Sequence, residues 1–73
     1  MKKKTIPIYK KLWCKIRYYQ QLHDLSNADL AAFIGVSERT LSEYDKDAAN
    51  LTLGKVDSFL KSEEISLKDL FDP

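Results

Sequence analysis

The chain has 73 residues, of which 44% are hydrophobic and 32% are charged, and its net charge is +1 at neutral pH. This length allows one domain near the lower limit for a single hydrophobic core, and no apolar run approaches the roughly 20 residues of a membrane span. The single cysteine, Cys14, excludes an internal disulfide and fits a reducing compartment, so we expect a cytoplasmic protein.

The charge is divided unevenly along the sequence. Residues 1–25 hold seven basic residues and one acidic residue, a net charge of +6, whereas residues 26–73 hold five basic and ten acidic residues, a net charge of −5. We expect residues 1–5 to form a flexible basic arm and residues 6–73 to form the folded domain.

A first helix is predicted near residues 6–24. Pro7 is tolerated in a first helical turn, and Thr5 is a candidate N-cap. Apolar and aromatic side chains recur with helical spacing and predict a stripe that faces the core: Leu12, Ile16, Tyr19 and His23.

Four further helix starts share one local pattern, in which an apolar residue precedes a serine or threonine and a second apolar residue follows four positions later. The hydroxyl residue suits an N-cap, and the two apolar residues suit a hydrophobic staple. The four caps are Ser26, Ser37, Thr52 and Ser66. They predict helices near 27–34, 38–45, 53–62 and 67–71, and no segment has the alternation of a strand, so the fold is expected to be all-α with five helices.

The segment 27–46 has the pattern of two short helices joined by a glycine turn. Ala31 is small at the position where two helices would cross closely, and Gly35 falls at the corner, where glycine adopts positive φ without a Cβ penalty. This pattern is typical of a helix-turn-helix, whose second helix usually enters the major groove of DNA.

From about residue 16 to residue 71, roughly three-quarters of the chain, the sequence resembles the Cro and phage-repressor family, often called XRE-like. The segments LSNADLAAFIGVSERTLSEY, NLTLGKV and ISLKDLF carry the resemblance. It implies a compact five-helix, lambda-repressor-like domain with its helix-turn-helix core at 27–46, encoded by a phage or mobile element. It also implies a Cro-like or repressor-like transcription regulator that binds operator DNA as a symmetric dimer.

The resemblance also assigns site residues. Asn27 takes a position that commonly contacts phosphate, and Ser37 caps the recognition helix. The positions that commonly face bases or phosphates are Glu38, Arg39, Ser42 and Glu43, and a helical wheel places Lys46 on the same side. Arg39 suits guanine, and a glutamate can accept a hydrogen bond from cytosine.

One family feature is expected to be missing. Members often pair an arginine near the end of the first helix with an acid after the recognition helix. Here the acid is Asp45, but the matching position holds Gln20. We therefore expect no ion pair between these two elements.

The expected partners are double-stranded DNA and a second copy of the chain, in a weak homodimer with Leu67 and Phe71 as its contacts. Other basic residues either touch DNA or are solvated: Lys2, Lys3 and Lys4 in the arm, and Lys10, Lys11, Lys15 and Arg17 on the first helix. No catalytic, metal, cofactor or small-molecule site is expected. The alternative is a protein-interaction module, an antirepressor or adaptor, because the recognition face is acidic.

Overall fold

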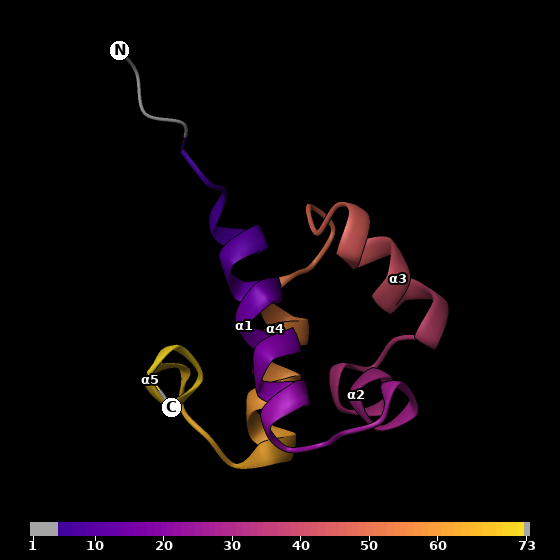
Figure 1. Ribbon diagram of the computed structural model, residues 1–73, viewed down its shortest axis with the longest axis vertical. Helices are drawn as coiled ribbons and strands as arrows, with labels where there is room; N and C mark the ends of the chain where they lie inside the picture. The colour runs from indigo at the N-terminus through magenta and orange to yellow at the C-terminus, as the bar shows by residue number, and fades with distance from the viewer. Residues whose placement is uncertain (1–4, 73) are drawn as a thin grey trace.

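The computed structural model describes residues 5–72, which form five helices and no strand. The helices are α1 (Ile8–Leu22), α2 (Asn27–Ile34), α3 (Glu38–Lys46), α4 (Leu53–Glu63) and α5 (Leu67–Phe71) (Figure 1). The predicted all-α fold is confirmed, with every helix end within two residues of its expected place. Lys2, Lys3 and Lys4 of the predicted arm lie outside the described residues.

Helix α1 is shorter than predicted at both ends. It begins after Pro7, because a residue that precedes proline, here Ile6, is disfavoured in the helical conformation. Pro7 is itself the N-cap without a side-chain cap bond, so Thr5 does not cap this helix. At the other end Asp24 adopts a left-handed conformation with φ of 52° and stops the helix. His23 consequently lies exposed beyond the helix, although its ring still packs on Tyr19.

The four predicted N-caps are confirmed. Each hydroxyl accepts a hydrogen bond from the backbone N–H three residues later, at 3.0 to 3.3 Å; the caps are Ser26, Ser37, Thr52 and Ser66. The Asp69 carboxylate also accepts a hydrogen bond from the backbone N–H of Ser66, which completes a capping box. These caps satisfy amide groups that a helix start would otherwise leave without partners.

The core is built where α2 packs on α3 and α4 and where α1 packs on α5 (Figure 1). The side chains of Ile16, Leu30 and Phe59 are completely buried at its centre. Two polar contacts connect α4 to its neighbours. The Tyr19 hydroxyl of α1 donates to Glu63 at 2.9 Å, and the Ser58 hydroxyl donates to the backbone carbonyl of Phe33 in α2 at 2.9 Å. Among the described residues, no helix combines the length and the apolar character that crossing a bilayer requires.

Gly35 forms the corner between α2 and α3, with φ of 87° and ψ of 37°. No heavy atom lies within 4 Å of the place that a Cβ would take, so only backbone conformation opposes a larger residue. Gly35→Ala should therefore lower the free energy of unfolding by about 1 kcal/mol. Gly54 lies within α4 with room for a methyl group, and Gly54→Ala should raise stability by about 0.5–1 kcal/mol. Chemical denaturation measures the change in the free energy of unfolding for each variant. A change of the same sign in the two variants would contradict the left-handed conformation assigned to Gly35.

Candidate nucleic-acid interface

The helix-turn-helix consists of α2, the Gly35 corner and α3. Ala31 is buried between the helices, and its carbonyl accepts hydrogen bonds from the backbone N–H groups of Gly35 at 2.8 Å and Val36 at 2.9 Å. These bonds close α2 and turn the chain into α3. Leu41 and Tyr44 then anchor the inner side of α3 in the core, and Tyr44 meets the Trp13 ring edge-to-face at 5.1 Å. The opposite side of α3 is thereby held toward solvent.

The outer side of α3 carries the side chains that the sequence predicted as a recognition surface. All five are exposed: Glu38, Arg39, Ser42, Glu43 and Lys46. The Arg39 side chain is 90% exposed, and its Nε lies 3.9 Å from a carboxylate oxygen of Glu43 one turn later. An exposed pair of this length holds its partners weakly. Arg39 is therefore free to exchange Glu43 for another acceptor.

Ser37 has a structural role at the start of α3. Its Oγ accepts from the backbone N–H of Thr40 at 3.3 Å and shares a second hydrogen bond with the Thr40 hydroxyl at 3.0 Å. Both contacts fix the direction in which α3 leaves the turn. Ser37 therefore positions Glu38 and Arg39 through the helix start.

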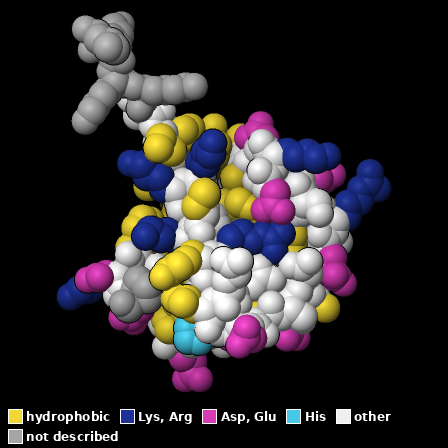
Figure 2. Space-filling model, in the orientation of Figure 1, with side chains coloured by type: hydrophobic (Ala, Val, Ile, Leu, Met, Phe, Trp, Pro, Cys, Tyr) yellow, Lys and Arg dark blue, Asp and Glu magenta, His cyan; other side chains and the backbone are white. Residues whose placement is uncertain are grey.

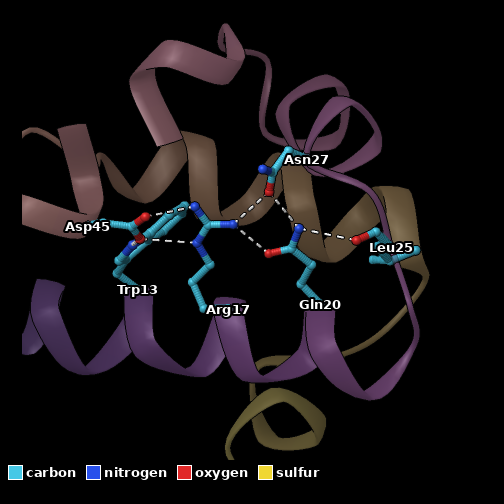
Figure 3. A network of polar contacts seen from close by, with 6 residues as sticks. All are labelled: Trp13, Arg17, Gln20, Leu25, Asn27 and Asp45. Atoms are coloured by element: carbon cyan, nitrogen blue, oxygen red, sulfur yellow. Dashed lines mark hydrogen bonds and ion pairs between the residues drawn. The ribbon is translucent and has the colours of Figure 1, made fainter. Parts of the chain in front are cut away.

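The expectation that α1 forms no ion pair with Asp45 is wrong. Arg17 forms an ion pair with Asp45 and donates two parallel hydrogen bonds to its carboxylate, from Nε at 3.0 Å and from Nη2 at 2.9 Å (Figure 3). Arg17 lies one turn before Gln20, the position matched to the family arginine, and on the same side of α1. Its long side chain reaches the carboxylate from there, so the contact between α1 and α3 is kept by a neighbouring residue.

Trp13 completes this contact. Its Nε1 donates to Asp45 at 2.8 Å, and the Arg17 guanidinium lies 5.2 Å from the centre of its ring. The hydrogen bonds from Arg17, reinforced by that from Trp13, hold the pKa of Asp45 below its ordinary value although partial burial opposes the shift. Asp45, near the end of α3, is thus an ionised acid whose negative charge is balanced by Arg17.

The same guanidinium organises the start of α2. Its Nη1 donates to the side-chain oxygens of Gln20 at 2.6 Å and Asn27 at 2.9 Å (Figure 3). Gln20 in turn donates to Asn27 at 2.9 Å and to the Leu25 carbonyl at 3.1 Å. Because arginine only donates, the amide oxygen of Asn27 must face inward and its NH₂ group must face away. That NH₂ group makes no hydrogen bond within residues 5–72, so it is an available donor at the first position of α2.

The remaining predicted residues lie on the side of the molecule formed by α1 and α5. Leu67 is 49% exposed, as expected of a dimer contact, but Phe71 is half-buried against the core. Phe71 packs inward because α5 lies directly on α1, where Lys15 covers its ring at 5.8 Å. Basic and hydrophobic side chains lie side by side over this part of the surface (Figure 2).

The chain is similar to a protein of Methanocaldococcus jannaschii that is named an HTH-type transcriptional regulator. The two are 32% identical over 57 residues, which cover 78% of this chain and 86% of that protein. No protein-family model matches the chain, and no solved structure matches it at a significant level.

Proposed function

This chain belongs to the helix-turn-helix transcriptional regulators, and we propose that it is a Cro-like or repressor-like protein that reads operator DNA through α3. The main observation behind the proposal is that α3 is anchored in the core by one side while its polar side faces solvent. Leu41 and Tyr44 bury one side of this helix, and its other side is polar and exposed. A helix held in this way fits the width of the major groove.

Separate roles follow for the residues on this surface. Arg39 is proposed to donate to guanine, and Glu38 and Glu43 to accept from cytosine. Ser42 and Lys46 are proposed to contact bases or phosphates at the edge of the groove. The outward NH₂ group of Asn27 is proposed to donate to a phosphate, which sets the register of α3 without reading sequence.

Selection of binding sites from random duplex DNA tests this function. The expected result is enrichment of a motif with two-fold symmetry, whose half-sites are centred about one helical turn, or about 34–36 Å, apart. The exposed acids Glu38 and Glu43 favour a second candidate, a protein-interaction module with weak or no DNA binding. Failure to enrich any sequence, even at low salt, would favour that candidate.

A weak homodimer is proposed to place two copies of α3 on the two half-sites. Leu67 is the better of the two expected contacts, because Phe71 is partly used by the core. Leu67→Asp should therefore leave the domain folded and monomeric, whereas the wild type should dimerise at high concentration. Leu53→Asp is the matched control, since Leu53 is 79% exposed on α4. Sedimentation measures all three, and equal behaviour of the two variants would reject Leu67 as a contact.

A further inference from the structure

An open groove with a volume of about 290 Å³ runs along the N-terminal half of α1 and is closed on one side by α5. Its floor is apolar, formed by carbon and sulfur atoms and by the stems of basic side chains. The residues that line it are Ile6, Lys10, Lys11, Cys14, Lys15 and Phe71. Ile6 is 52% exposed, so its side chain is accessible to an occupant of the groove.

The rim of the groove is basic. Lys10, Lys11 and Lys15 all belong to it, and no acidic residue lines it. None of the three lysines forms an ion pair within the described part of the chain, whereas Lys61 and Arg17 each have an acidic partner. An occupant that is both hydrophobic and anionic would match the apolar floor and the three lysines, which have no acidic partner within residues 5–72.

Three other occupants fit less well. A small ligand would remain largely exposed, because the volume lies at the lower end of ligand sites and the groove is open along its length. A second copy placed symmetrically over the groove would bring its own three lysines against these three. Duplex DNA would leave the apolar floor unused, because its contacts are mainly polar and ionic.

The geometry points to a docking site for an acidic peptide segment of a partner protein, which inserts an apolar side chain between Ile6 and Phe71 and pairs its carboxylates with Lys10, Lys11 and Lys15. The groove lies on the α5 side of α1, whereas α3 lies on the opposite side (Figure 1). A peptide in the groove would therefore leave α3 accessible to DNA. This site is independent of the proposed DNA surface, and either can fail without the other.

The test uses the full chain and a fluorescent peptide in which glutamates alternate with leucines. Polarisation should show binding that weakens with added salt. Lys10→Glu/Lys15→Glu should weaken it at least about tenfold by reversing two rim charges. Lys55→Glu/Lys61→Glu makes the same change of net charge outside the groove and should alter affinity less than about twofold. Bound peptide should also slow alkylation of Cys14, the only thiol of the chain.

Shape is tested separately from charge. Cys14→Trp should fill the groove and abolish peptide binding with all three lysines in place, while its melting temperature shows that the domain remains folded. Equal binding of a peptide with serine in place of leucine would overturn the proposal, since the apolar floor would then have no role. Equal protection of Cys14 by octanoate would instead indicate a small-amphiphile site. Loss of self-association in Cys14→Trp would assign the groove to a second copy.

Discussion

Arg17→Met is expected to lower the free energy of unfolding by about 2 kcal/mol. The substitution keeps an apolar stem but removes hydrogen bonds to Asp45, Gln20 and Asn27, three acceptors contributed by three different helical segments. A hydrogen bond to a charged partner contributes about 1.5–3 kcal/mol to stability when it is shielded from water. The side chains of Arg17 and Asp45 are 26% and 48% exposed, so solvent screening reduces this contribution.

Arg39→Met provides the matched control for this measurement. Arg39 has one exposed and long contact, so its loss should change stability by no more than about 0.5 kcal/mol. Urea denaturation of both variants compares the two arginines directly. Equal losses would mean that the Arg17 contacts add nothing beyond an ordinary surface charge.

The Arg17 contact also predicts how stability depends on pH. Because the hydrogen bond from Arg17 lowers the pKa of Asp45, the folded state holds this proton less readily than the unfolded state. The stabilisation is therefore complete above the ordinary carboxyl pKa of about 4 and is lost as pH falls through the lower folded value. Asp45→Asn should be less stable at neutral pH and should lose less stability on acidification. A parallel acid transition in wild type and variant would contradict the cause assigned to the shift.

Replacing Lys2, Lys3 and Lys4 by alanine is expected to produce the largest change in DNA affinity. The outer side of α3 carries two cations against two glutamates, so it supplies little net attraction to phosphate. If all three lysines contact phosphate, the slope of log affinity against log salt should become shallower by up to about 2.7. Over a fourfold change of salt, this difference is worth roughly 40-fold in affinity.

A second triple variant separates arm contacts from net charge. Lys55, Lys61 and Lys68 belong to α4 and α5, and their replacement by alanine removes the same charge. The salt slope of this variant should match that of the wild type. Equal slopes for all three proteins would show that the arm does not contact DNA.

Local sequence rules predicted most of the fold, because its signals act within a few residues. The four hydroxyl caps and Gly35 each satisfy a nearby backbone group or conformation, and a reader of the sequence can place them without a tertiary structure. Pro7 could have set the start of α1 more closely, since the restriction on the residue before proline is equally local.

The contacts of Arg17 were missed because they depend on tertiary geometry. A long side chain can reach a partner from more than one position, so matching Gln20 to a family arginine gave the wrong answer for Asp45. The sequence did contain one indication of this network, because Trp13, Arg17 and Gln20 are spaced to lie along one side of α1. The partial burial of Phe71 could not be predicted for a similar reason, because only the packing of α5 on α1 shows which of its sides is covered.

The central claim is that α3 reads bases, and Arg39→Ala tests it most directly. The measurement is the difference in binding free energy between the selected site and a scrambled duplex, at one fixed salt concentration, for wild type, Arg39→Ala and Lys46→Ala. Arg39→Ala should reduce that difference by about 1–3 kcal/mol and relax preference at one base pair, while its affinity for the scrambled duplex changes little. Lys46→Ala, if Lys46 contacts phosphate, should weaken both complexes alike. An unchanged difference for Arg39→Ala, with the same preferred site as the wild type, would contradict base reading by this helix position.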